Sequence, residues 1–250
     1  ISGSVIIIPG MNYPAFKVGK RTSPIDGGNM NRVFPGNPEG TFTEKIADYF
    51  NRTLLPMADF VVDFHSGGKT LDFLPFCCAH VLDDKEQQEK CIAAMEAFNA
   101  PHSVMLLEID AVNMYDTAAE NMGKVFISTE LGGGGSTTAY TVEIAKKGIR
   151  NILRHAGITE GDLEVDETLN LDMPDDNCYI FSESTGLVEH CVDLGDEVKS
   201  GQLIAKVHNI ERTGSPPDEY HAKIDGIFTG KHFPGLVVNG DFLGVIAVPV

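Results

Sequence analysis

The sequence predicts an α/β fold in which helices flank a mixed sheet, followed by a smaller β-rich domain. Two observations lead to this prediction. From Val5 to about Gly157, short apolar runs rich in β-branched residues alternate with helical patterns, as in strands joined by crossover helices. After Asp176, strand patterns and turn glycines replace the helical ones. The length of 250 residues and the 42% hydrophobic content allow one large domain or two modest ones.

Four strands are predicted in the first part of the chain. Each run is too short and too continuously apolar to be an amphipathic helix. Because ligands of open α/β sheets bind at the carboxyl ends of the strands, the residues that end these runs are the first candidates for chemistry. The predicted strands are residues 4–8, 60–64, 102–107 and 125–130.

Three helices are predicted between and after these strands. The first begins with a capping box, Thr41 with Glu44, and carries an apolar residue at every fourth position from Ile46. Pro56 helps to end it. The other two helices are residues 85–98 and 141–155.

An acidic segment divides the chain. Residues 159–176 contain eight Asp or Glu residues and few apolar ones, a composition typical of a self-repelling connector. We therefore predict a first domain of residues 1–158, a linker of residues 159–176, and a β domain of residues 177–250.

The β domain contains an internal repeat with an offset of 40 residues. Gly186, Gly195 and Val198 recur as Gly226, Gly235 and Val238. A duplicated β unit of this size predicts a small barrel-sandwich of two interlocking halves, and the pattern resembles lipoyl and biotinyl domains. In those carriers a lysine on the hairpin between the halves bears the cofactor, whereas residues 208–221 contain no lysine. The resemblance therefore implies the same fold used as a lid or wall.

Composition excludes several classes of function. The 36 acidic and 19 basic residues give a net charge of −17, which disfavours nucleic acid and acidic membranes as partners. No apolar run approaches the roughly 18 residues of a membrane span, so we expect a cytoplasmic protein. Five cysteines without a Cys-x-x-Cys pair indicate free thiols rather than disulfides or a zinc finger. No Gly-x-Ser-x-Gly motif supports a serine hydrolase.

His65 lies at the end of a strongly apolar predicted strand. A neutral imidazole in this place suits zinc, although a histidine satisfied by loop backbone is the alternative. Gly68-Lys69-Thr70 resembles the end of a phosphate-binding loop, but Asp63 occupies the position of the first glycine, so we reject nucleotide binding. The remaining histidines show no ligand spacing: His80, His102, His155, His190, His208, His221 and His232.

Glu130 ends another predicted strand, directly before the glycines at positions 132–135. A partly desolvated carboxylate there can have a raised pKa and act as a general base, whereas the alternative is a solvated edge glutamate. The glycines could bind an anion, but such a run is more often a flexible turn. Glu130 together with His65 on a neighbouring strand suggests metal-assisted hydrolysis.

A polar, glycine-rich loop of residues 21–32 precedes the first helix. Asn31 and Arg32 can bind a carboxylate through an amide donor and a guanidinium fork, and Arg21 could polarise a carbonyl oxygen. The alternative is a solvated surface loop.

The order of these motifs resembles a known family. Asn-Met-Asn-Arg at 29–32, Asp-Phe-His at 63–65, Thr-Glu-Leu-Gly at 129–132 and the β-rich tail are similar to the succinylglutamate desuccinylase/aspartoacylase family of zinc amidohydrolases, whose catalytic fold is carboxypeptidase A-like. The resemblance covers essentially the whole chain. Residues 23–36 and 63–68 look most like the bacterial deacetylases that act on N-acetyl-2,4-diaminobutyrate in ectoine breakdown.

The resemblance implies a role for each candidate. His65 would be a ligand of a single zinc ion, Glu130 the general base, Asn31 and Arg32 the substrate carboxylate site, and Arg21 the residue that polarises the scissile carbonyl. The implied reaction is zinc-dependent hydrolysis of the amide of a small N-acyl amino acid, a linear amide other than a peptide bond. A metallocarboxypeptidase on short peptides and a non-catalytic carboxylate-binding relative remain alternatives. Exposed sandwich edges also suggest a homo-oligomer.

One feature departs from the family pattern. The first two zinc ligands of the family come from a Gly-x-His-Gly-x-Glu motif, and no His-x-x-Glu occurs upstream of His65. We therefore expect these 250 residues not to hold zinc tightly. Since the chain begins directly in a predicted strand, we expect the other two ligands upstream of Ile1; a naturally metal-free relative is the alternative.

Overall fold

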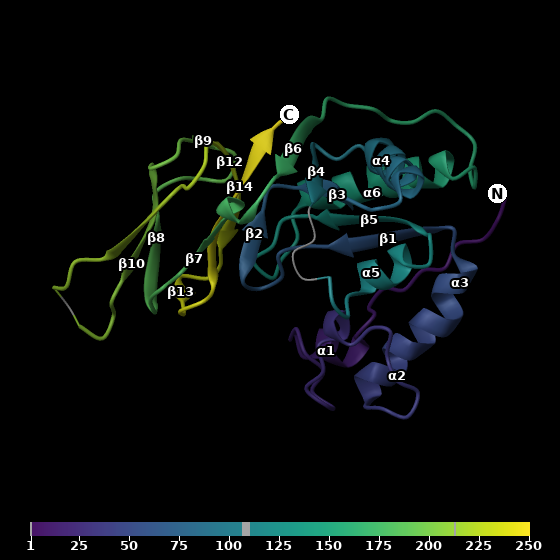
Figure 1. Ribbon diagram of the computed structural model, residues 1–250, viewed down its shortest axis with the longest axis horizontal. Helices are drawn as coiled ribbons and strands as arrows, with labels where there is room; N and C mark the ends of the chain where they lie inside the picture. The colour runs from purple at the N-terminus through teal and green to yellow at the C-terminus, as the bar shows by residue number, and fades with distance from the viewer. Residues whose placement is uncertain (1, 107–110, 213) are drawn as a thin grey trace.

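The computed structural model describes residues 2–106, 111–212 and 214–250. Within them the strands form two sheets (Figure 1). The larger, ten-stranded sheet contains β1 (Phe60–His65), β2 (Leu71–Phe73), β3 (Phe76–His80), β4 (His102–Leu106), β5 (Val125–Glu130), β6 (Leu169–Met173), β7 (Tyr179–Phe181), β9 (Glu197–Val198), β12 (Gly226–His232) and β14 (Phe242–Pro249). Its main path is β1-β5-β3-β4-β6-β14-β12-β2. The smaller sheet has the order β11 (Asp218–His221), β10 (Leu203–His208), β8 (Gly186–His190) and β13 (Leu236–Val237).

The first half of the large sheet is mixed, as predicted. β5 runs parallel to β1 and antiparallel to β3, while β4 is parallel to both β3 and β6. The strands predicted at 60–64 and 125–130 are confirmed as β1 and β5. The strand predicted at 102–107 forms β4 as far as Leu106, and residue 107 lies outside the described residues.

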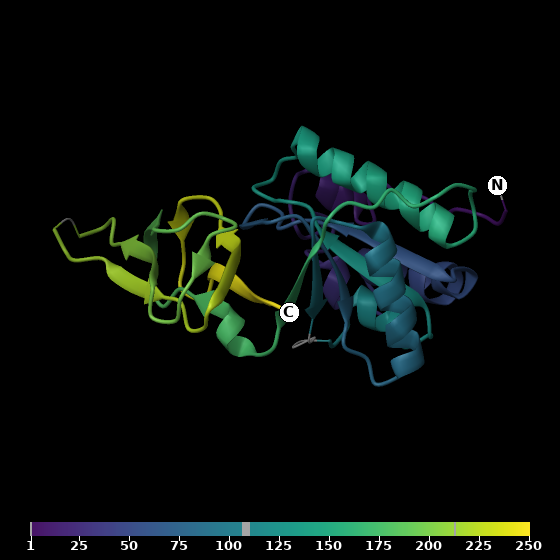
Figure 2. The ribbon, with the colours of Figure 1, turned by 90° about the horizontal axis from the view of Figure 1, so that it is seen from above.

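Helices cover both faces of this sheet (Figure 2). On one face, α4 (Lys85–Phe98) and α6 (Ala139–His155) share a core with Val125 and Ile127 of β5. On the other face, Phe126 packs with Leu55 and with Ala119 of α5 (Tyr115–Glu120). Successive residues of a strand point to opposite faces, so β5 serves both cores. The predicted helix-flanked sheet is thereby confirmed.

The segment before β1 contains short helical elements joined by turns and loops. It contains α1 (Tyr13–Lys17), η1 (Met30–Arg32), α2 (Phe42–Tyr49), the π-helical turn η2 (Phe50–Leu54) and α3 (Leu55–Met57). The capping box of Thr41 with Glu44 is present as predicted. Pro56 lies in the last turn, and the chain leaves the helix at Ala58. The helix predicted at 141–155 begins two residues earlier, at Ala139, behind a second capping box.

The strand predicted at residues 4–8 is wrong. These residues have no regular secondary structure and no strand pairing in the described part of the chain, and Ile7 is 79% exposed. A β-branched run forms a strand only when a neighbouring backbone pairs with it, and composition does not reveal the neighbour. Conversely, β3 was not predicted, although all five of its residues are buried.

The predicted linker is anchored to the rest of the protein. Within it, β6 pairs with β4 and β14, and Leu171 and Met173 are buried. Glu164 accepts hydrogen bonds from Arg150 and Arg154 of α6, so acidic residues of the segment pair with cations. The domain limits at residues 158 and 177 stay a prediction.

The two repeats of the β domain exchange strands, as predicted. β8 begins at Gly186 and pairs with Val237 of β13, whereas β12 begins at Gly226 and pairs with Val198 of β9. Each long strand therefore pairs with a short strand of the other repeat. Both positions require glycine because a side chain would clash with a neighbouring backbone. A Cβ at Gly186 would lie 2.2 Å from the carbonyl oxygen of His208, and a Cβ at Gly226 would lie 2.5 Å from the carbonyl oxygen of Ala247.

Candidate active site

His65 and Glu130 are paired residues at the carboxyl ends of β1 and β5. The parallel register places their Cα atoms opposite each other. The hydroxyl of Thr129, which is fully buried, accepts a hydrogen bond from the backbone nitrogen of His65 and can donate to its carbonyl oxygen, each at 3.2 Å. The sheet and this hydroxyl together hold the two candidates side by side.

Negative charge surrounds the imidazole of His65. Its Nδ1 atom lies 3.3 Å from Oδ2 of Asp63. This hydrogen bond raises the pKa of His65 to about 9; partial desolvation opposes the rise, the charges of Glu130 and Asp63 add to it, and the charge of Arg21 opposes it. Surroundings that favour an imidazolium also favour a metal cation, because both are positive.

Glu130 has the properties of a base near neutral pH. Burial raises its pKa to about 7, against the attraction of His65 and Arg21, while Asp63 adds to the rise. Within the described part of the chain, its Oε2 atom is shielded from solvent and has no hydrogen-bond partner. A carboxylate poised between its two protonation states can both accept and return a proton.

Arg21 lies close enough to affect both residues. Its positive charge acts to lower the pKa of His65 and that of Glu130. Arg21 is exposed to solvent. The charge of Arg21 thus acts on the His65–Glu130 pair, and its carbonyl-polarising role stays a prediction.

Asn31 and Arg32 lie on η1, next to α5. The Oδ1 atom of Asn31 accepts a hydrogen bond from the backbone nitrogen of Tyr115 at 2.7 Å. This bond orients the amide, so Nδ2 is left to donate to a ligand. Arg32 donates from Nη1 to the carbonyl oxygen of Asn31 at 2.6 Å, and its side chain is exposed.

Tyr115 connects this loop to the strand ends and was not predicted as a site residue. Its ring packs against Phe34, Phe50 and Phe126, with centroids 5.1, 6.0 and 5.8 Å away. Burial raises the pKa of Tyr115 to about 12, and the charge of Asp63 adds to the rise. A lone tyrosine in a segment without periodicity carries no signal that could have singled it out.

His65 does not form a zinc site by itself. Among residues 2–106, 111–212 and 214–250, no group of three or more His, Cys, Asp or Glu side chains could hold a metal ion. A catalytic zinc site has three protein ligands. The described residues therefore fit one ligand and a base, and they do not fit a complete site. The five cysteines are free; four are buried, as expected of structural thiols, whereas Cys191 is exposed. His80 and His232 have hydrogen-bond partners.

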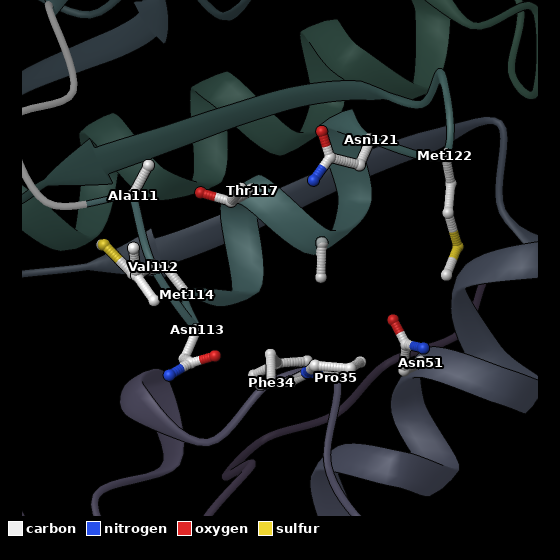
Figure 3. A pocket seen from close by; sticks show the side chains of 11 residues that line it. Phe34, Pro35, Asn51, Ala111, Val112, Asn113, Met114, Thr117, Asn121 and Met122 are labelled. Carbon is white, nitrogen blue, oxygen red and sulfur yellow. The ribbon is translucent and has the colours of Figure 1, made fainter.

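A pocket of about 470 Å³ lies elsewhere (Figure 3). Phe34, Pro35 and Asn51 line one side, and Thr117 of α5 and Asn121, which follows α5, line the other. Its lining contains no charged side chain and none of the five candidate residues.

Comparisons with known proteins give a consistent result. The model of the succinylglutamate desuccinylase/aspartoacylase catalytic domain matches residues 1–156. An N-alpha-acetyl-L-2,4-diaminobutyric acid deacetylase of Halomonas elongata is 52% identical over 249 residues, which are 99% of this chain and 73% of that protein.

Solved structures agree with this comparison. The product-bound ectoine utilization protein EutE (DoeB) of Ruegeria pomeroyi is 62% identical with a TM-score of 0.95, over 97% of this chain and 74% of that one. A succinylglutamate desuccinylase/aspartoacylase of Rhodobacter sphaeroides is 34% identical with a TM-score of 0.92, over the same shares. In the described residues, none of the helices combines the length and apolarity of a membrane span.

Proposed function

Because the chain belongs to the succinylglutamate desuccinylase/aspartoacylase family, we propose that it hydrolyses the amide bond of a small N-acyl amino acid. The proposed substrate is N-acetyl-2,4-diaminobutyrate, after the names of its relatives. The observation that carries the proposal is the His65–Glu130 pair at the strand ends, with the pKa of Glu130 raised to about 7.

Glu130 is the general base and acid of the reaction. Its unpartnered Oε2 atom takes a proton from a water molecule as the water oxygen bonds to the acetyl carbon. Glu130 then passes the proton to the amide nitrogen, the C–N bond breaks, and acetate and the free amine leave. Arg21 stabilises the negative charge that develops on the carbonyl oxygen.

Asn31 and Arg32 bind the α-carboxylate of the substrate. The bond from Tyr115 fixes the orientation of the Asn31 amide, so its NH₂ group donates, and the exposed guanidinium of Arg32 supplies charge-assisted hydrogen bonds. Holding the carboxylate determines where the scissile amide lies relative to Glu130.

Zinc is a further part of the proposal, since the family is zinc-dependent in general. When bound, zinc acts as a Lewis acid and lowers the pKa of water. His65 would supply one ligand; the remaining donors are not among the described residues. We also propose a small-molecule partner and a cytoplasmic location.

A non-catalytic carboxylate-binding protein is the second candidate, favoured by the incomplete donor set in the described residues. Acetate release from N-acetyl-2,4-diaminobutyrate, with and without added zinc, separates the two. Zinc-stimulated release supports the deacetylase. No release, no bound zinc by atomic absorption and retained binding of the amino acid would favour the binding protein. Cleavage of di- and tripeptides but not of N-acetyl amino acids would indicate a carboxypeptidase.

A further inference from the structure

Asp26 connects the substrate loop to the first turn of α2. Its Oδ1 atom accepts hydrogen bonds from the backbone nitrogen of Gly28 at 3.0 Å and from the hydroxyl of Thr43 at 2.8 Å. Its Oδ2 atom accepts from the backbone nitrogen of Thr43 at 2.6 Å. One carboxylate thus holds two segments that are 17 residues apart.

The loop around Asp26 is closed and tightly packed. Ser23 donates from its backbone nitrogen to the carbonyl oxygen of Gly28 at 2.9 Å, and Gly27 donates to that of Ser23 at 2.8 Å. Gly27 has a φ of +71°, and a Cβ on Gly28 would lie 2.7 Å from the Thr43 side chain. Two consecutive glycines give this backbone many alternatives when unrestrained, so it needs an external anchor.

The anchor lies only five residues before Asn31. Between them, the Oδ1 atom of Asn29 accepts from the backbone nitrogen of Asn31 at 3.3 Å, and the side chain of Met30 is buried in a cluster with Ala47 of α2. A shift at Asp26 is therefore transmitted to η1 through a short, packed path. Asn31 is restrained from two directions: by α2 through Asp26 and by α5 through Tyr115.

We propose that Asp26 is a positioning residue for substrate binding: through Gly28 and Thr43 it holds Asn31 and Arg32 where they meet the α-carboxylate. This inference rests on the proposed function and names a residue outside the set considered so far. Asp26 does not touch the substrate.

The charge state of Asp26 suits this role. Partial desolvation acts to raise the pKa of Asp26, but hydrogen bonds from Thr43, Gly28 and Ser23 outweigh it and hold the pKa below its ordinary value. The carboxylate therefore remains an acceptor at both oxygens at neutral pH, as the geometry with three donors requires.

The kinetic test compares Asp26→Asn with two variants of its partner. Asn cannot accept at its NH₂ group, so the bond from the Thr43 nitrogen is lost. We expect the KM for N-acetyl-2,4-diaminobutyrate to rise about tenfold while kcat stays within about threefold, because the lost hydrogen bond loosens the loop that carries Asn31 and Arg32. Thr43→Ser retains the hydroxyl and should keep the KM of wild type, whereas Thr43→Val loses the hydroxyl bond to Asp26 and should raise the KM. Asp48→Asn, which alters a carboxylate of the same helix bonded to Arg52, is the matched control and should leave the KM unchanged.

A substrate without the carboxylate separates positioning from general damage. N-(3-aminopropyl)acetamide is the same amide without its α-carboxylate. If Asp26 acts through the carboxylate site, Asp26→Asn lowers kcat/KM for the acetylated amino acid but leaves it unchanged, relative to wild type, for this analogue. An equal loss on both substrates, or a KM within twofold of wild type, would overturn the proposal.

Hydrogen exchange provides a readout that needs no activity. Peptides covering residues 23–32 should exchange at least about tenfold faster in Asp26→Asn, while peptides of β1 and β5 stay as in wild type. Unchanged exchange in residues 23–32 would refute the anchoring by Asp26. A wild-type protein that hydrolyses nothing would refute the proposed function, and the exchange result would still decide whether Asp26 orders the loop.

Discussion

The side-chain Oδ1 of Asn31 caps α5 across 84 residues of sequence, by accepting from the backbone nitrogen of Tyr115 at 2.7 Å. The residue at the usual capping position, Met114, offers no side-chain cap. The oxygen of this amide holds a helix, and under the proposed function its nitrogen donates to the substrate carboxylate, so one amide has two uses.

Two substitutions at Asn31 separate these uses. Asn31→Asp retains the oxygen acceptor and loses the NH₂ donor, so the melting temperature should stay near that of wild type while the KM rises through repulsion of the substrate carboxylate. Asn31→Ala loses the cap as well and should cost about 1 kcal/mol of unfolding free energy. Urea unfolding and initial rates measure the two effects. Equal stability of both variants would contradict the capping role.

Glu130→Gln should lower kcat at least about 100-fold, because general acid–base catalysis is typically worth 100- to 10,000-fold. The rate of acetate release at saturating substrate measures this kcat. Glu143→Gln is a suitable control, since Glu143 is an exposed residue of α6 paired with Lys146. Turnover of Glu130→Gln within threefold of wild type would remove Glu130 from the mechanism.

The same substitution should stabilise the metal-free protein at high pH. Burial raises the pKa of Glu130 from its ordinary 4.5 to about 7, so between these pH values the folded protein keeps a proton that the unfolded chain has released. The free energy of unfolding therefore falls as the pH rises from about 4.5 to about 7 and levels off above that. The stability lost over this pH range corresponds to at most about 3 kcal/mol. Unfolding with EDTA at pH 4 and pH 8 should show the Gln variant gaining on wild type as the pH rises; a constant difference would contradict the burial of the charge.

Glu164 should show the opposite dependence on pH. Hydrogen bonds from Arg150 and Arg154 lower its pKa from 4.5 to about 2, so its contribution to stability is present above pH 4.5 and is lost as the pH falls through about 2. Glu164→Gln should therefore melt at a lower temperature at pH 7 and at the same temperature as wild type near pH 2. Glu160→Gln, in the same segment, should follow wild type throughout. A difference for Glu164→Gln that persists at pH 2 would point to packing instead of charge.

Local chemistry explains which parts of the fold could be predicted. The capping box at Thr41 and the continuous apolar runs of β1 and β5 depend on neighbours in sequence, so the pattern identifies them. β3 depends on its position between β4 and β5, where even Cys77 and Cys78 are buried, and a short run with two cysteines and a histidine has no periodicity.

The candidate site divides in the same way. His65 and Glu130 could be paired in advance because both end apolar strands of one sheet, and ends of parallel strands meet at one edge. The contacts of Tyr115 and Asp26 could not, since each depends on a hydrogen bond between residues far apart in sequence. Charge in the predicted linker was misleading, because pairing of Glu164 with α6 is visible only in three dimensions.

The continuous ladder of the large sheet has a mechanical consequence. β14 pairs with β6 and β12 pairs with β2. Backbone hydrogen bonds therefore join the C-terminal lobe, residues 177–250, to the first lobe, the part of the chain before it, at two places. A hinge between the lobes would have to break both sets of bonds in every turnover. Admission of substrate and departure of product therefore depend on side chains and loops that move against a stiff frame, and mutations that slow the cycle without altering chemistry should map to those loops.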